Sequence, residues 1–189
     1  MSTTELFVEL LIIGIGAAIW IVLLLLSVFG ISWLPSEALL SVTALIPALA
    51  VVYVLGIVVD RLCDRLFELI WRESLFRQYY DNRQAYYDDR RILYLYGAGL
   101  AQLLEYGRSR LRICRGWAVN ALLIALSLNL FAWTQIANGA VRLKVSLGGT
   151  LLLLLFAYAN WYAWSQLTVT TYRKIQQQAA FIRHYKLHE

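Results

Sequence analysis

The sequence predicts an all-α, polytopic membrane protein with four transmembrane helices and a cytoplasmic helical hairpin or stalk. The first observation is composition: 60% of the 189 residues are hydrophobic and 15% are charged, whereas soluble domains contain about 45–50% apolar and about 25% charged residues. The second observation is that the charges are unevenly placed, because four long stretches contain none. Together the two observations exclude an ordinary soluble domain.

The four charge-free stretches are the predicted transmembrane helices. They are 22 to 28 residues long, and a helix needs about 20 residues to cross a hydrocarbon layer about 30 Å thick. Turn-forming residues separate the first two stretches at Gly30–Glu37, and a similar connection joins the last two at Thr134–Lys144. We therefore expect two antiparallel hairpins. The four stretches are Leu10–Ser36, Ala38–Val59, Gly116–Val141 and Val145–Tyr172.

Basic residues predict the orientation in the membrane. Eleven arginines lie in the central segment 60–115, and four more Lys or Arg residues follow residue 172, whereas the two short loops contain only Arg142 and Lys144. Because Lys and Arg are enriched in cytoplasmic loops, we expect both termini and the central segment to be cytoplasmic. The predicted organisation is transmembrane helices 1 and 2 in 1–59, a cytoplasmic helical hairpin in 60–115, transmembrane helices 3 and 4 in 116–172 and a cytoplasmic C-terminal helix in 173–189.

The central segment is predicted to be helical, although it carries 19 of the 29 charged residues. Apolar and aromatic residues recur in steps of three, four and seven, and Glu68–Arg72 and Glu73–Arg77 are favourable pairs four residues apart. We expect the second transmembrane helix to continue into the cytoplasm, with a reversal near Asp81 and a second flexible point at Gly97. Two helices of about 25 residues each would project about 35–40 Å from the membrane.

The C-terminal tail is predicted to form a third helix of this cytoplasmic module. A 3-4-3 spacing places four apolar or aromatic residues on one face of a helix that continues from the fourth span. We expect this face to pack on the two helices of the hairpin. The four residues are Tyr172, Ile175, Ala179 and Ile182.

Tyrosines and arginines are interleaved along residues 79–94. Guanidinium groups bind phosphate through two parallel hydrogen bonds, and aromatic faces stack on bases, so these side chains are candidates for sensing a nucleotide, another ligand or a cytoplasmic protein partner. The alternative is a packing seam, in which tyrosine keeps its hydroxyl in water and arginine pairs with nearby carboxylates. The candidates are Tyr80, Arg83, Tyr87, Arg90, Arg91 and Tyr94.

A second basic cluster precedes the third span. Arginines beside a membrane gain about 1 kcal/mol each from an anionic leaflet, so we expect this cluster to contact membrane lipids. Specific binding of nucleic acid is not expected, because the formal net charge is only +5 and no recognition motif is present. The residues of the cluster are Arg108, Arg110, Arg112 and Arg115.

Polar side chains inside the predicted spans are the next candidates. No charged residue lies in the middle of a span, which argues against a proton-coupled transporter. Asparagine in hydrocarbon needs a hydrogen-bond partner, so these side chains line a pore or join helices. Asn129 lies opposite Asn120 on the third span, so we expect a single protomer to leave one of them near lipid and a homo-oligomer to bury both. The candidates are Tyr53, Asp60, Asn120, Ser127, Asn129 and Asn160.

Motifs of known chemistry are missing from the sequence, which has no Walker loop and no GxGxxG, HExxH, GxSxG or CxxC pattern. His184 and His188 are four residues apart but have no cluster of further ligands around them in the sequence. Cys63 and Cys114 are expected to be reduced residues at the membrane boundary. We therefore expect neither an enzyme nor a resident metal or cofactor.

These features support three hypotheses of function. The first is a homo-oligomeric pore or channel-like assembly whose cytoplasmic stalk senses a ligand or partner. The second is a non-conducting membrane scaffold or assembly subunit that docks a cytoplasmic partner. The layout is also similar in outline to small multi-span pore-forming effectors of bacterial defence and to minimal channels. That resemblance implies the third hypothesis, a small membrane effector of a defence system.

Overall fold

A computed structural model of the chain describes residues 3–31, 42–96 and 98–186, and these residues form helices joined by short turns. The all-α prediction is therefore confirmed. Four helices are long and apolar enough to cross a membrane, over Leu6–Phe29, Leu45–Arg77, Gly107–Gln135 and Gly139–His184. The helices are α1 (Thr3–Phe29), α2 (Val42–Phe67), the π-helical η2 (Glu68–Arg72), α3 (Glu73–Arg77), α4 (Arg83–Tyr96), α5 (Ala98–Gln135) and α6 (Gly139–Lys186).

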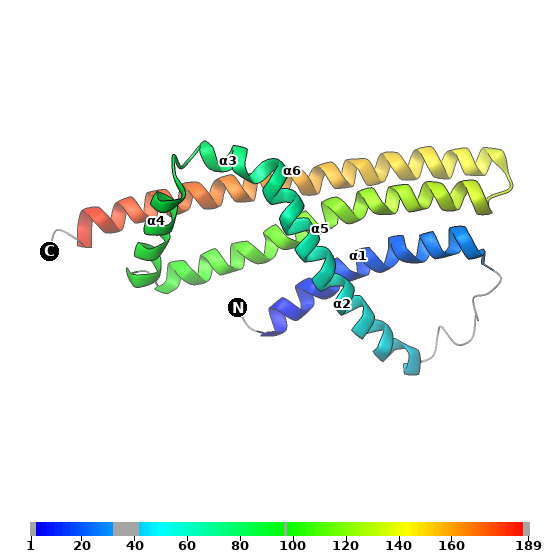
Figure 1. The fold of residues 1–189 in the computed structure, drawn as a ribbon, viewed down its shortest axis with the longest axis horizontal. Helices are drawn as coiled ribbons and strands as arrows, with labels where there is room; N and C mark the ends of the chain where they lie inside the picture. Colours follow the sequence, from blue (N-terminus) through cyan, green and yellow to red (C-terminus); the bar gives the residue numbers. More distant parts are fainter. Residues whose placement is uncertain (1–2, 32–41, 97, 187–189) are drawn as a thin grey trace.

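Helix α5 is the centre of the bundle, because it packs against α1 on one side and α6 on the other (Figure 1). The C-terminal part of α6 lies at the same end of the molecule as α4, while the α5–α6 turn lies at the opposite end. This turn covers only residues 136–138, and the Asn138 side chain caps α6 by accepting hydrogen bonds from the backbone of Ala140 and Val141 at 3.0 and 3.2 Å. The predicted second hairpin is present, with a shorter turn than expected.

Helix α2 crosses α1 obliquely at a point where two glycines allow the backbones to touch. A Cβ atom on Gly14 would lie 1.9 Å from the carbonyl oxygen of Val52, and one on Gly56 would lie 2.0 Å from that of Leu10. Such close approach favours packing between transmembrane helices. Helix α1 ends at Phe29, and Gly30 follows it with a φ of 75°, which suits glycine. The predicted connection Gly30–Glu37 falls mostly outside the described residues.

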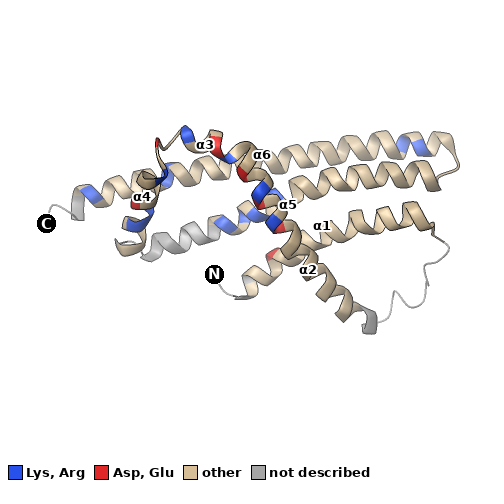
Figure 2. Cartoon of the chain, in the orientation of Figure 1, with Lys and Arg blue, Asp and Glu red and all other residues tan. Residues whose placement is uncertain are grey.

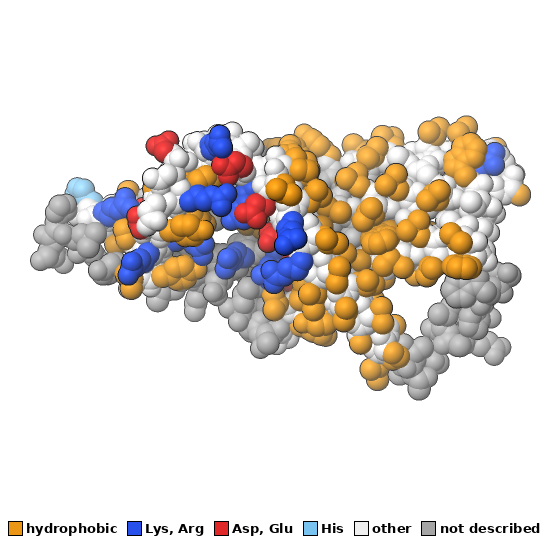
Figure 3. All heavy atoms as spheres, viewed as in Figure 1, with side chains coloured by type: hydrophobic (Ala, Val, Ile, Leu, Met, Phe, Trp, Pro, Cys, Tyr) orange, Lys and Arg blue, Asp and Glu red, His pale blue; other side chains and the backbone are white. Residues whose placement is uncertain are grey.

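Charged residues gather at one end of the molecule, which we call the charged end (Figure 2). It comprises η2, α3, α4 and the parts of α2, α5 and α6 beside them. The helices at the other end carry few charges, and their surface is largely hydrophobic (Figure 3). The structure therefore has an apolar half of membrane-spanning character and a polar half.

The segment predicted to form a cytoplasmic helical hairpin is helical with a reversal, while its side of the membrane stays a prediction. Helix α2 does continue without a break through η2 and α3 to Arg77, and the chain does reverse within residues 78–82, next to Asp81. The next helix, α4, has 14 residues rather than about 25, and it crosses α6 and α5 instead of pairing with α3. The predicted flexible point, Gly97, lies outside the described residues. Instead of a second long helix that projects from the membrane, the structure has the short helix α4 packed across the bundle.

The predicted seam on the C-terminal helix is present, because α6 continues to Lys186. All four residues of the seam are buried. Three of them form a cluster with Tyr80 and Leu93, and the ring of Tyr172 lies edge-on to Phe76 and Tyr86 at 5.8 and 5.7 Å. This burial explains the shape of the hairpin, since α4 covers the apolar face of α6 rather than extending away from it.

Candidate functional site

Asn120 joins α5 to α1. Its side-chain amide donates to the carbonyl oxygen of Ile13 at 2.9 Å and its oxygen accepts from the indole N–H of Trp20 at 3.3 Å. The residue is fully buried. Its hydrogen-bonding capacity is thus satisfied by an inter-helix contact.

Asn129 joins α5 to α6 on the opposite face. Its amide donates to the hydroxyl of Thr150 at 2.6 Å, and its oxygen accepts a hydrogen bond from Ser146. Both asparagines are hydrogen-bonded within one protomer, but Asn120 is buried and Asn129 only half-buried, so the burial of both in a homo-oligomer stays a prediction.

The remaining polar candidates in the spans make local contacts. Ser127 is buried and donates to the carbonyl of Leu123 one turn earlier at 2.8 Å, and Asn160 does the same to Phe156 at 2.9 Å. Tyr53 packs on Phe7 with ring centroids 5.0 Å apart. Neither of the two cavities described below is lined by these residues or by the two asparagines.

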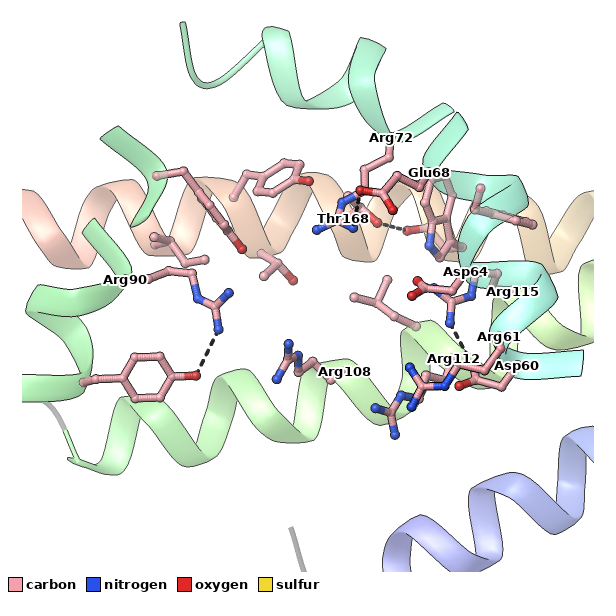
Figure 4. Close-up of a pocket in the computed structure, with 18 residues that line it drawn as sticks. Asp60, Arg61, Asp64, Glu68, Arg72, Arg90, Arg108, Arg112, Arg115 and Thr168 are labelled. Atoms are coloured by element: carbon pink, nitrogen blue, oxygen red, sulfur yellow. Dashed lines mark hydrogen bonds and ion pairs between the residues drawn. The ribbon is translucent and has the colours of Figure 1, made fainter. Parts of the chain in front are cut away.

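One cavity lies at the charged end, where α2, η2, α4, α5 and α6 meet (Figure 4). It has a volume of about 280 Å³, close to the lower limit of small-molecule pockets, about 300 Å³. Three tyrosines and two threonines contribute hydroxyl groups to its wall. The charged residues that line it are Asp60, Arg61, Asp64, Glu68, Arg72, Arg90, Arg108, Arg112 and Arg115. We call it the arginine cavity, because its six arginines exceed its three carboxylates.

Half of the arginines have carboxylate partners. Arg115 of α5 binds Asp60 at 2.8 Å and also Asp64, so it ties α5 to α2. Arg72 pairs with Glu68 at 3.5 Å. Arg112 lies 3.7 Å from Glu9, a buried carboxylate of α1 outside the cavity. Neither side-chain oxygen of Glu9 accepts a hydrogen bond from a described residue.

The other three, Arg61, Arg90 and Arg108, form no ion pair with a described carboxylate. Arg90 is held in place by a hydrogen bond to the hydroxyl of Tyr94 at 3.1 Å. Its guanidinium also lies 5.5 Å from the ring centroid of Tyr86. Arg90 and Arg108 extend from α4 and α5 toward the same space (Figure 4). The cavity therefore carries positive charge that the described side chains leave uncompensated.

The structure divides the predicted sensing residues. Arg90 and Tyr94 line the arginine cavity, whereas Arg83 and Tyr87 line a second cavity of about 60 Å³. Arg91 is exposed and lines neither. Tyr80 is buried, where its hydroxyl donates to Asp89 at 3.0 Å; burial and the negative charge of Asp89 raise the pKa of Tyr80. Tyr80 thus belongs to the packing seam that was the alternative interpretation.

The predicted lipid-contact cluster meets the sensing residues in this cavity. Arg108, Arg112 and Arg115 line it, and Arg110 does not. Asp60, a candidate from the spans, lines it as well. Asp64, Glu68 and Arg72 also line the cavity and were not predicted as site residues. The spacing of four from Asp60 to Asp64 to Glu68 places the carboxylates on one helical face and could have indicated them.

No protein family, curated protein or solved structure matches this chain. The chemistry of the site therefore has to be argued from its own geometry. Guanidinium groups bind phosphate oxygens in pairs of parallel hydrogen bonds, and the neighbouring hydroxyls can donate as well. Within the described part of the chain, no group of three or more His, Cys, Asp or Glu side chains could hold a metal ion. The arrangement suits an anion.

Proposed function

We propose that this chain is a multi-pass membrane protein that binds a small phosphate-bearing anion in the arginine cavity, with the charged end and both termini on the cytoplasmic side. The observation that supports this function is the set of three cavity arginines without a carboxylate partner among the described residues. A hydrogen bond to a charged group contributes about 1.5–3 kcal/mol. An anion that reaches Arg90 and Arg108 together would therefore bind favourably.

The position of the cavity favours a sensing role. Its walls are the continuations of α2, α5 and α6, which also form the apolar half of the molecule. A ligand that draws α4 toward α5 would change the packing of α5 against α2 at the Arg115–Asp60 contact. Binding of an anion in the cavity would then be coupled to the packing of the membrane-spanning parts of these helices. This proposal keeps the ligand-sensing part of the pore hypothesis, but the asparagines that motivated a pore are occupied in contacts within one protomer.

A scaffold that docks a cytoplasmic partner is the second candidate. It is favoured by the outer face of α4, where Tyr87 and Leu95 are 56% and 67% exposed and Arg91 is also exposed. Tyrosine and arginine are enriched in protein–protein interfaces. Arg91→Glu separates the two functions, because it should abolish capture of a partner and leave phosphate binding unchanged.

The proposed function is tested by the thermal stability of the full chain in mild detergent. Inorganic phosphate and small phosphate esters should raise the melting temperature, whereas choline and Mg²⁺ should not, because ligands that bind only the folded state stabilise it. The R90Q/R108Q variant should lose this response. Arg173→Gln is the matched control, since Arg173 is exposed and lines neither cavity. An unchanged melting temperature with every phosphate compound would refute the proposal.

A further inference from the structure

The wall that α2 and η2 contribute to the arginine cavity has two opposite faces. Asp60, Asp64 and Glu68 line the cavity. Residues 62 and 66 lie on the other face, because each is two positions from a carboxylate and two positions turn a helix by about 200°. Residue 69 lies on that face too, because it is seven positions, or about two turns, after residue 62. All three are leucines, and they are 62%, 40% and 82% exposed.

A water-soluble helix turns its apolar face inward, and Cys63 and Phe67 of this segment are buried in that way. The three leucines are instead exposed, whereas Asp60 is buried and the side chains of Asp64 and Glu68 are 42% and 46% exposed. Hydrophobic surface continues up to the charged residues in Figure 3. The exposed leucines suit hydrocarbon, and the cavity behind them lies where the hydrophobic surface gives way to the charged end.

We infer that the anion in the arginine cavity is the headgroup phosphate of an anionic phospholipid, with its acyl chains against the leucine face of α2 and η2. This inference rests on the proposed function and names the source of the ligand. The volume of about 280 Å³ suits a small headgroup, because pockets for larger ligands extend to about 1,000 Å³.

Charge indicates which headgroup binds best. Three cavity arginines lack a carboxylate partner among the described side chains. A phosphate monoester carries a charge of about −1.5 to −2 at neutral pH, whereas the diester of phosphatidylglycerol carries one negative charge. The monoester headgroup of phosphatidic acid therefore compensates the site most fully. The expected order of affinity is phosphatidic acid, then phosphatidylglycerol, then phosphatidylcholine.

Native mass spectrometry of the full chain, released from mild detergent, tests the inference. The ligands are dioctanoyl phosphatidic acid, dioctanoyl phosphatidylcholine, and glycerol 3-phosphate, which has the headgroup of phosphatidic acid but no acyl chains. Phosphatidic acid should bind at least about tenfold more tightly than either of the others. R90Q/R108Q should reduce phosphatidic acid binding by about tenfold or more, and Arg173→Gln should not change it.

A second variant tests the acyl-chain contact separately. L62Q/L69Q changes two exposed residues that do not line the cavity, so it should weaken phosphatidic acid and leave glycerol 3-phosphate binding unchanged. Equal affinity for the two ligands, lost in R90Q/R108Q, would overturn the lipid inference while the proposed function stands. Binding of neither ligand would overturn both.

Discussion

The guanidinium of Arg115 binds the carboxylate of Asp60 at 2.8 Å, and the two side chains are only 11% and 6% exposed. Arg115 lies on α5 and Asp60 on α2, so the pair connects two of the helices that are long and apolar enough to span a membrane, at the edge of the arginine cavity. Asp64 is the second partner of Arg115, and it is more exposed than Asp60. The buried charge of Asp60 is stabilised by the guanidinium of Arg115, because an isolated charge is costly to bury.

Removing Arg115 should therefore destabilise the protein strongly. Arg115→Gln leaves Asp60 buried without its cation, and breaking such a pair costs about 3–5 kcal/mol. The measurement is the free energy of unfolding in mixed detergent micelles. R115Q/D60N should recover part of the loss, since it removes the buried charge as well. Equal stability of Arg115→Gln and the wild type would show that the pair is not buried as described.

The crossing of α1 and α2 gives a prediction about the size of the side chain that fits at position 56. Gly56→Ala adds a methyl group 2.0 Å from the carbonyl oxygen of Leu10, so the helices must separate, and overpacking costs about 1–3 kcal/mol. The melting temperature should fall. Gly148→Ala is the control, because nothing lies within 4 Å of its added methyl group and alanine is the better helix former by about 1 kcal/mol. Equal effects of the two substitutions would contradict the crossing.

Asn120 and Asn129 should behave as structural residues. Asn129→Leu leaves the hydroxyls of Ser146 and Thr150 without their partner, and hydrogen bonds between membrane helices contribute about 0.6 kcal/mol on average, up to about 1.7. We expect a loss of stability of this size and no effect on phosphate binding. Conductance in liposomes that depends on either asparagine would instead support the pore hypothesis.

Tyr80 gives a prediction about pH. Its pKa is raised in the folded protein by burial and by Asp89, so the folded state keeps the proton at a pH where the unfolded chain releases it. Stability from this group is complete below the ordinary tyrosine pKa of about 10 and declines as the pH rises above it. The slope of melting temperature between pH 9 and about 11 should be shallower for Tyr80→Phe, which should also lose about 1 kcal/mol at neutral pH. Identical slopes would contradict the buried Tyr80–Asp89 contact.

Local patterns in the sequence predicted the helices well. Charge-free length identified the four spans, and the spacing from Tyr172 to Ile182 identified the buried face of α6, because both signals are contained in one helix. The reversal next to Asp81 followed from turn residues in the same way. These features need no knowledge of neighbouring helices.

The site could not be predicted in the same manner, since it depends on which helices meet. Arg90 and Arg108 were assigned to two different roles, and only the crossing of α4 over α5 and α6 places them around one cavity. The opposed faces of Asn120 and Asn129 were predicted correctly, but their partners on α1 and α6 were not, because α5 is the central helix. Both outcomes depend on which helices are neighbours in space, and no local sequence pattern contains that information.

The affinity of inorganic phosphate for the full chain in mild detergent tests the central claim most directly. The claim is that Arg90 and Arg108 bind one anion together. The wild type and Arg173→Gln should bind phosphate equally, and R90Q/R108Q should bind it at least about tenfold more weakly. Equal affinity of all three proteins, or no binding by the wild type, would contradict the account.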